Sequence, residues 1–585
     1  MLSSHSTTRT NVANVLVVGA GAAGLRAAIA GHQAGAEVVV LGKRARKDAH
    51  TVLAAGGINA ALGTRDPQDS YGQHFADTLR EGYFLSDPRV VEIVVREAPD
   101  AVEELAEWGC AFARTPDGRL DQRYFGAHKY RRTCYAGDYT GRAMINALDG
   151  RVAGLGIPVL EDQYVSRLLT TEGRCFGALA FDLMTGDRTV FLADAVVLAA
   201  GGHTRMWRKS SSRRDENNGD GMYLALEAGC RLADMELVQF HPTGMVAPEE
   251  MAGTLVTEAV RGEGGRLLNA DGERFMTRYD RERMELSTRD RVALANYTEI
   301  QEGRAGPHGG VFLDISHRGK DYILERLPRM YRQFLEYQML DISASPMEVA
   351  PTAHYSMGGV VVDPENHSTG VAGLYAAGEV TAGLHGANRL GGNSLTETIV
   401  YGRRAGEAAA EYSSGQDAQL RSRTAIGDAQ DELSSYIRNG TEFARPLQRA
   451  LRDTMWECCG VVRSEAQITA GLARVDELRS LLGEVDVRPS SEGYGDLAHA
   501  LDLRASLVGA EASLRGALAR RETRGAHIRT DHPDLDPALQ VNFHVVRSGD
   551  GTLEVCPEPI APVPEHMQAW AKDDDAIDTT GRLLE

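Results

Sequence analysis

The sequence lacks features that would point to a membrane-spanning or secreted protein. It contains no run of about eighteen apolar residues, the length that a helix needs to cross a bilayer. Residues 1–10 are polar and lack the apolar core of a secretory signal. We therefore expect no transmembrane helix, and a location in the cytoplasm or on the inner face of a membrane.

The 7 cysteines also lack the spacing of a metal site. None of them forms a Cys-x-x-Cys pair, so the sequence suggests neither an iron-sulfur cluster nor a structural zinc site. We expect no metal in this chain. Any electrons that the protein handles would have to leave it through another molecule.

A surplus of positive charge is absent as well. The 63 Lys and Arg residues are outnumbered by 82 Asp and Glu residues, which gives a formal charge of -19. A field of this sign opposes binding to nucleic acids and to anionic lipids, because both are polyanions. Arginine and histidine residues that gather inside motifs are therefore informative about a small anionic ligand.

What the sequence does contain, near its start, is a nucleotide-binding pattern. An apolar run at residues 14–18 leads into Gly-Ala-Gly-Ala-Ala-Gly at 19–24, a helix is predicted over 23–34, and a second strand over 37–41. Glycines in such a strand-turn-helix unit let backbone amides approach a pyrophosphate at the helix N-terminus. We assign Gly19, Gly21 and Gly24 to dinucleotide binding.

The second strand ends without the acidic residue that usually accepts the ribose hydroxyls in a simple NAD or FAD site. It runs instead into Gly42, Lys43 and Arg44. The missing carboxylate argues against an ordinary NAD site, and basic residues suit a phosphate-bearing or anchored cofactor better. Lys43 is therefore a candidate cofactor residue.

Two further residues can be interpreted in more than one way. His50, about thirty residues beyond the glycine motif on the path of a long dinucleotide, could tether a flavin or could be a surface or core histidine. Asp220, in Asn-Gly-Asp-Gly at 218–221, could accept hydrogen bonds from sugar hydroxyls or could cap the helix predicted over 222–228. The residues alone leave both questions open.

The second half of the nucleotide fold is interrupted by a polar insertion. A hairpin is predicted around Thr-Gly-Asp at 185–187, and a buried strand at 195–200 returns the chain to the sheet. The insertion carries charged residues flanked by glycines, and ligands often bind between the halves of a cofactor domain. Beyond it, Arg389 stands in a rigid glycine-bounded segment that suits bidentate binding of a carboxylate.

These observations predict an α/β fold with a Rossmann-like FAD-binding domain, an inserted α+β capping domain, a helical domain and a C-terminal extension. Residues beyond 413 have the composition of a linker, and residues 447–473, 478–483 and 501–521 are amphipathic. The predicted ranges are 1–240 and 351–413 for the FAD-binding domain, 241–350 for the capping domain, 430–535 for the helical domain and 536–585 for the extension.

Together the motifs resemble the flavoprotein subunit of succinate dehydrogenase and quinol:fumarate reductase. The resemblance extends from residue 12 to about residue 532 and follows the family order: the motifs at 19–24, 50–52, 239–244, 261–265, 385–395 and 523–527. It implies that the chain interconverts succinate and fumarate on a covalent FAD. It also implies two kinds of partner, membrane anchor subunits and an iron-sulfur subunit, which would carry electrons to or from quinone on the cytoplasmic face of the cell membrane.

The resemblance also implies roles for individual residues. It makes His50 the covalent FAD tether, with Thr51, Gly56, Gly57, Asp220, Glu379, Ser394 and Leu395 as further FAD contacts. It makes His241 and Thr257 the pair for one substrate carboxylate, and His354 and Arg389 the pair for the other. It makes Arg289 the proton-transfer residue, with Glu258 and Arg261 as its relay.

The implied interconversion of succinate and fumarate needs residues of these types. Oxidising succinate removes a hydride from one carbon and a proton from the next, so the site needs an electron-pair acceptor on one face and a base on the other. Arginine is a weak candidate for a base, because its pKa is ordinarily above about 12. Arg289 is therefore credible only when Glu258 and Arg261 are coupled to it.

Departures from the family pattern leave other functions open. Ala55 replaces the usual Gln or Glu beside the flavin, and Arg142 replaces the histidine that commonly follows Thr-Gly. L-Aspartate oxidase shares the fold but is expected to lack the tethering histidine. Two more candidates are a soluble fumarate reductase, often with its own haem domain, and a catalytically silent partner. Fumarate reduction could also be the physiological direction.

Overall fold

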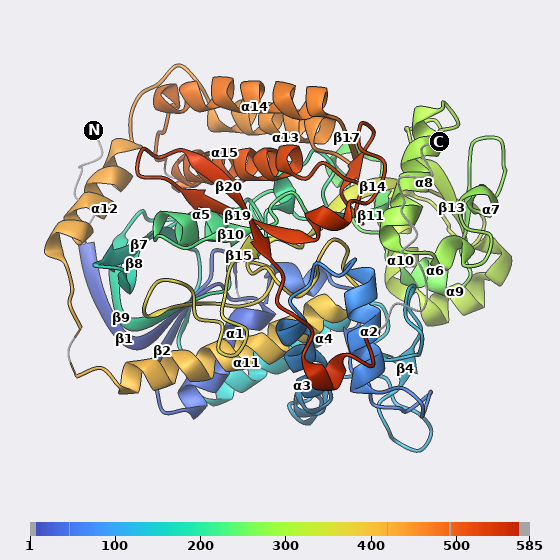
Figure 1. Ribbon diagram of the computed structural model, residues 1–585, viewed down its shortest axis with the longest axis horizontal. Coiled ribbons are helices and arrows are strands. Elements are labelled where there is room, and N and C mark those ends of the chain that lie inside the picture. Colours follow the sequence, from blue (N-terminus) through green and yellow to red (C-terminus); the bar gives the residue numbers. More distant parts are fainter. Residues whose placement is uncertain (1–7, 46, 418, 491–492, 572–585) are drawn as a thin grey trace.

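The computed structural model describes residues 8–571 apart from residues 46, 418, 491 and 492. Figure 1 shows a twisted sheet above a layer of long helices, a separate mixed region coloured green, and a row of helices coloured orange and red along the opposite side. Residues 572–585 of the predicted C-terminal extension lie outside the described residues.

The sheet that was predicted from the glycine motif is present. Strand β1 (Thr8–Val18) pairs in parallel with β2 (Val38–Leu41) and with β9 (Arg188–Leu198), and β16 (Leu374–Ala376) pairs in parallel with β9. The short β6 (Val159–Leu160) extends one edge, and the antiparallel pair β7 (Gln163–Thr171) and β8 (Arg174–Asp182) extends the other. The strands at its centre are continuous apolar runs because side chains cover both of their faces.

Helices α1 (Ala22–Gln33) and α11 (Asn393–Ser414) lie side by side under this sheet (Figure 1). Small residues permit this contact: a Cβ on Gly406 would lie 2.2 Å from the Ala27 carbonyl oxygen. Three more helices complete this layer: α2 (Tyr71–Glu81), α3 (Pro88–Glu107) and α4 (Thr140–Gly154). Asp87 caps the start of α3, because its side chain accepts a hydrogen bond from the Arg89 amide.

The hairpin predicted around residues 185–187 is also present, as β8 and β9. The sequence suggested a short second arm and then a separate buried strand, whereas β9 is one continuous strand that does both tasks. It pairs with β8 through its first half and with β16 through its last three residues. A single long strand therefore joins the hairpin to the parallel sheet.

The inserted region is α+β, as expected. Its sheet has the order β11 (Val238–Met245), β14 (Met347–Ser356), β13 (Val311–Asp314) and β12 (Arg266–Leu268). The helices that surround this sheet are α6 (Ala259–Gly262), α7 (Met276–Tyr279), α8 (Arg289–Gln301), α9 (Lys320–Arg326) and α10 (Pro328–Gln338). Both expected boundaries of the insertion, 240/241 and 350/351, fall inside the paired strands β11 and β14.

The helical region contains α13 (Ala444–Cys458), α14 (Glu465–Ser480) and α15 (Gly495–Ala519). The amphipathic stretch 447–473 is divided between α13 and α14 by a turn that contains β17 (Val462–Arg463). The segment expected to be a linker contains a further helix, α12 (Arg423–Ser435), which is capped by Ser422 and buries Leu433. Composition alone missed it because its exposed face is polar.

The predicted C-terminal extension contains a hairpin, β19 (Val541–Arg547) and β20 (Leu553–Pro559). It is more than a surface extension, because β19 pairs with β10 (Leu232–Ala233), and β10 pairs with β15 (Gly359–Val360). Val545 and Leu553 are buried against the second face of the main sheet, together with helix α5 (Asp220–Glu227). The hairpin thus completes the hydrophobic core on this face of the main sheet.

The remaining strands are the short pieces β3 (Ile58–Asn59), β4 (Gln122–Arg123), β5 (Thr133–Cys134) and β18 (Ile528–Arg529). Among the residues that the structure describes, no helix is both long enough and apolar enough to cross a membrane.

Candidate functional site

One cavity collects almost every residue that the sequence singled out. The residues that line it are Gly19, Gly21, Lys43, His50, Thr51, Gly56, Gly57, Asp220, His241, Thr257, Glu258, Arg289, His354, Glu379, Arg389, Ser394 and Leu395. The two predicted site residues that do not line it are Gly24 and Arg261. Residues up to about 375 positions apart in the chain therefore meet at the carboxyl ends of the parallel strands, where such sheets bind ligands.

The glycine motif forms a tight cradle at the N-terminus of α1. Gly19 has a φ of +117°, and a Cβ there would lie 2.1 Å from the Ala199 carbonyl oxygen at the end of β9. A Cβ on Gly24 would lie 1.8 Å from the Gly19 carbonyl oxygen, so Gly24 packs the helix against the turn without facing the cavity. This cradle, with the start of a twelve-residue helix behind it, fits the pyrophosphate of a dinucleotide.

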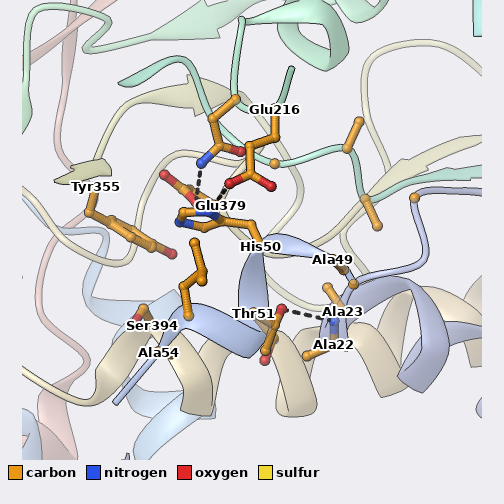
Figure 2. Close-up of a pocket in the computed structure, with 18 of the residues that line it drawn as sticks. Ala22, Ala23, Ala49, His50, Thr51, Ala54, Glu216, Tyr355, Glu379 and Ser394 are labelled. Carbon is orange, nitrogen blue, oxygen red and sulfur yellow. Dashed lines mark hydrogen bonds and ion pairs between the residues drawn. The ribbon is translucent and has the colours of Figure 1, made fainter. Parts of the chain in front are cut away.

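The next cavity wall is the short turn η1 (His50–Leu53) (Figure 2). The Thr51 hydroxyl accepts a hydrogen bond from the Ala22 amide at 3.2 Å, which fixes the turn to the start of α1. His50 Nδ1 lies 2.8 Å from a carboxylate oxygen of Glu216. Burial alone would lower the pKa of His50, but the Glu216 carboxylate outweighs it and raises that pKa.

Lys43, at the end of β2, is held between two carboxylates. Its Nζ lies 3.4 Å from Asp220 and 2.7 Å from Asp502, a residue of α15. Asp220 is not the helix cap that the sequence left open: Gly219 precedes the helix, and Asp220 is its first residue. The Asp220 side chain lines the cavity instead, where it can meet sugar hydroxyls.

Another part of the cavity wall is formed by Gly57, Glu379, Ser394 and Leu395. Gly57 has a φ of +151°, and a Cβ there would lie 2.5 Å from Thr133 Cγ2. Glu379 accepts a hydrogen bond from the Ser356 amide at 3.1 Å, and burial raises the pKa of its carboxyl group. Ser394 and Leu395 open helix α11 beside it, and the Ser394 hydroxyl accepts a hydrogen bond from Arg389 at 2.9 Å.

The candidate substrate residues lie where β11 and β14 pass from the sheet domain into the inserted region. His241 on β11 pairs in register with Thr352, two residues before His354 on β14, and the two imidazole rings are 5.2 Å apart. Burial, reinforced by the charges of Arg289 and Arg261, lowers the pKa of His241 well below its usual value. Burial and the neighbouring His241 do the same for the pKa of His354.

Both histidines are therefore neutral near pH 7 and act as hydrogen-bond partners. The Thr243 amide donates to His241 Nδ1 at 3.2 Å, so the neutral ring carries its proton on Nε2. His354 Nδ1 is 2.9 Å from the Ser211 hydroxyl. Thr257, which is 2% exposed, accepts from the Ala259 amide at 3.3 Å and faces the same cavity.

Arg389 supplies an unused donor to this space. It is 3% exposed, its guanidinium carbon lies 4.6 Å from the centre of the Tyr355 ring, and its buried Nε has no hydrogen-bond partner among the described residues. Burial and the nearby Arg289 lower the pKa of Arg389 to about 9, so it still carries a positive charge near neutrality. A buried arginine with an unsatisfied N–H group is suited to an anionic ligand.

Arg289 is bound tightly to Glu258. Its Nε and one terminal nitrogen lie 2.8 and 2.7 Å from the same carboxylate oxygen, and its other terminal nitrogen donates to Gln239 at 2.9 Å. Burial alone would raise the pKa of Glu258, but the two arginines lower it to about 2. Arg261 lies behind this pair, 3.8 Å from Glu258, and donates to the Glu285 carbonyl oxygen.

The cavity therefore has two chemically different ends. The end near α1 offers backbone amides, sugar-binding polar groups and His50, which fits FAD. The other end sets Arg289 and Arg389, with Arg261 behind them, against one carboxylate, Glu258, beside two neutral histidines. Three guanidinium groups and one carboxylate leave two positive charges, which fits a small molecule with two negative charges. The gap between the arginine pair and the His50 turn is continuous, since all of these residues line one cavity.

Three residues that hold site side chains in place went unnoticed from the sequence. Gln239 precedes His241 in the same motif, and its fixed spacing from the histidine could have suggested a role. Glu216 and Asp502 gave no such signal, because neither belongs to a motif, and Asp502 reaches Lys43 from a helix 459 residues further along. Only folding brings these carboxylates to the cofactor end.

Two family descriptions match the chain. The FAD binding domain family matches residues 14–395, and the family described as fumarate reductase flavoprotein C-term matches residues 448–566. The chain is 45% identical to a fumarate reductase (CoM/CoB) subunit of Methanothermobacter marburgensis, over 90% of this chain and 95% of that relative.

Similarities to solved structures point to the same family. The chain resembles Mycobacterium smegmatis Sdh1 in complex with UQ1 with a TM-score of 0.87, at 39% identity, over 96% of each chain. It resembles the quinol fumarate reductase of E. coli with a TM-score of 0.90, at 34% identity, over 95% of this chain and 99% of that one. These similarities confirm the predicted fold class and do not favour L-aspartate oxidase.

Proposed function

The chain belongs to the family of FAD-binding flavoprotein subunits of fumarate reductases and succinate dehydrogenases, and on that basis we propose that it interconverts succinate and fumarate in this cavity. The observation that carries the proposal is the end of the cavity where two buried arginines and two neutral histidines surround one space. A dicarboxylate matches both the charge and the two-ended arrangement of these donors.

Binding would use residues on opposite sides of that space. His241 Nε2–H and the Thr257 hydroxyl would donate to one carboxylate, while Arg389 and His354 would hold the other. The unsatisfied Arg389 Nε gives this arginine a free donor for the purpose. Holding both ends fixes the central carbon-carbon bond in one orientation, which is a large part of the catalytic advantage.

FAD would be held by the glycine cradle, Lys43, Thr51, Gly56, Gly57, Asp220, Glu379, Ser394 and Leu395, with His50 as its covalent tether. When bound, it supplies a hydride acceptor or donor for one substrate carbon. The proton on the adjacent carbon would be carried by Arg289. Glu258, ionised because its pKa is about 2, holds Arg289 by one hydrogen bond and a further ion-pair contact, and Arg261 stands behind it as the next group in the relay.

Electrons would leave or enter through partner subunits. We propose an iron-sulfur subunit that docks on this chain, together with membrane anchor subunits that exchange electrons with quinone on the cytoplasmic face of the cell membrane. The 45% identical relative is named for CoM and CoB, so these two compounds are the second candidate reductant. Copurification of partners, followed by assays with quinol and with CoM and CoB, separates the two.

The test of the main proposal is a pair of assays on the purified protein. Succinate should reduce an artificial electron-accepting dye, and fumarate should oxidise a reduced viologen dye. L-Aspartate, offered in the same dye assay, should give no reduction. Protein that carries a full complement of flavin but responds to neither dicarboxylate would contradict the proposal.

A further inference from the structure

The environment of His50 contains a carboxylate that no motif pointed to. Glu216 lies in the loop before α5, its side chain is 7% exposed, and one of its oxygens lies 2.8 Å from His50 Nδ1. Figure 2 shows the Glu216 side chain directed at the His50 ring from the loop above the η1 turn. The histidine is thus held from one side by a buried acid.

Glu216 is itself held in position by Arg213. The Arg213 backbone amide donates to Glu216 at 2.8 Å, and its guanidinium donates to both carboxylate oxygens at distances of 2.9 to 3.2 Å. The same guanidinium binds the Asp48 side chain at 2.6 Å and the Asp48 carbonyl oxygen at 2.7 Å. Arg44 adds two further bonds to the Asp48 carboxylate, so the loop of Glu216 and the segment of His50 form one unit.

This arrangement determines which nitrogen of His50 carries the proton. An ionised carboxylate can only accept a hydrogen bond, so His50 Nδ1 must be the donor. In the neutral ring the lone pair then lies on Nε2, at the opposite side of the imidazole from Glu216. Second partners of this kind fix the tautomer and the ring orientation of histidines in metal and catalytic sites.

We propose that Glu216 is the positioning residue for flavin attachment: it fixes His50 as the Nδ1–H tautomer and leaves Nε2 as the atom that bonds to the flavin. This inference rests on the proposed function, in which His50 is the tether. Arg213 and Asp48 act through Glu216 by keeping its carboxylate in place.

The attachment step balances as follows. His50 Nε2 would gain a bond to a ring methyl carbon of FAD, that carbon would release one hydrogen as a proton to solvent, and the imidazole would give up its Nδ1 proton toward Glu216. The electron pair released from the carbon-hydrogen bond is taken up by the flavin ring system. Fumarate, the substrate of the proposed reaction, then accepts that pair with two protons and leaves as succinate.

The test compares total flavin with acid-stable flavin in four purified proteins, each produced as the full chain. These are the wild type, Glu216→Gln, Glu216→Asp, and the control Glu227→Gln, which removes a carboxylate from the other end of α5 where it pairs with Arg547. Total flavin is measured by absorbance of the native protein. Acid-stable flavin is measured by fluorescence of the denatured band after electrophoresis.

We expect Glu216→Gln to bind flavin but to lose the acid-stable fraction, because an amide can donate to Nδ1 and so favour the wrong tautomer. Glu216→Asp should restore part of that fraction, and Glu227→Gln should match the wild type. A merely structural role for Glu216 would lower total flavin and leave its acid-stable fraction unchanged.

Two results would overturn different statements. If the wild type is tethered and Glu216→Gln is tethered equally well, the role of Glu216 is wrong while the proposed function stands. If the wild type itself releases all its flavin in acid, the His50 tether in the proposed function is wrong. Should Glu216→Gln be insoluble, Arg213→Met decides: a reduced acid-stable fraction supports the role of Glu216, and a wild-type fraction contradicts it.

Discussion

Lys43 at the end of β2 and Asp502 in the middle of α15 form an ion pair of 2.7 Å although 459 residues separate them in the chain. Asp502 also accepts hydrogen bonds from Tyr164 at 2.9 Å and Asn218 at 3.3 Å, and its side chain is 2% exposed. The helical region is therefore bonded directly to the proposed cofactor site. It does more than support the rest of the fold.

This contact predicts that a mutation in α15 weakens flavin binding. In a His50→Ser background, where no tether masks release, Asp502→Asn should weaken flavin affinity by roughly tenfold, or about 1.4 kcal/mol, because Lys43 loses its closer charged partner. Fluorescence titration of the released flavin measures the effect. Asp453→Asn, at an exposed ion pair with Arg208, is the control and should leave affinity unchanged. Equal affinities for both variants would contradict the prediction.

Arg389 leads to a second prediction. Replacing Arg389 by methionine keeps most of the side-chain length but removes the buried guanidinium group that would donate to a substrate carboxylate. We expect the KM for succinate to rise by roughly 100-fold, since a lost charged hydrogen bond in such a site costs about 3 kcal/mol. Steady-state dye reduction checks this. Arg208→Met, on the surface, should behave as the wild type, and an unchanged KM in Arg389→Met would place the substrate elsewhere.

The two site histidines predict a particular dependence of stability on pH. Their folded-state pKa values lie well below the usual 6.5, mainly through burial, whereas the unfolded chain protonates them near that value. The unfolded state therefore binds more protons once the pH falls below about 6.5, and stability must drop there, by up to about 1.4 kcal/mol per pH unit for each histidine.

The double variant His241→Asn, His354→Asn should show a shallower loss of stability between pH 6.5 and 5 than the wild type, as followed by denaturant unfolding. Other buried histidines keep part of the slope in both proteins. The exposed His317→Asn is the matched control and should leave the slope unchanged. A double variant as steep as the wild type would show that these two rings are not buried in their neutral form.

The sequence predicted the parts of the fold whose signals are local. The glycine motif, the βαβ unit that contains it and the hairpin around residues 185–187 all follow from periodicity and turn residues. Helix α12 was missed because it shares its polar composition with a linker. The edges of the insertion fall inside strands because β11 and β14 serve both regions at once.

The site residues also divide into those that a sequence motif could reveal and those that only the fold brings to the site. Arg389 could be proposed from its glycine-bounded segment, and His241 and Arg289 could be proposed only through the resemblance of their motifs to a known family. Glu216 and Asp502 could not, because their roles depend on contacts across the fold, to His50 and to Lys43. A lone carboxylate in a loop or on a buried helix has no periodic or spacing signal that separates it from ordinary surface charge.

Arg289 is the residue that would carry the proton in the proposed reaction. Glu258 holds it by one hydrogen bond and a further ion-pair contact, and it faces the same cavity as the candidate substrate residues. The most direct test is the rate of fumarate-dependent oxidation of a reduced viologen dye by Arg289→Met, with flavin content measured in the same sample. We predict that the variant reacts roughly 10²- to 10⁴-fold more slowly than the wild type at unchanged flavin content, because a positioned acid or base usually contributes a factor of this size. A variant that retains both its flavin and its rate would contradict proton transfer through Arg289.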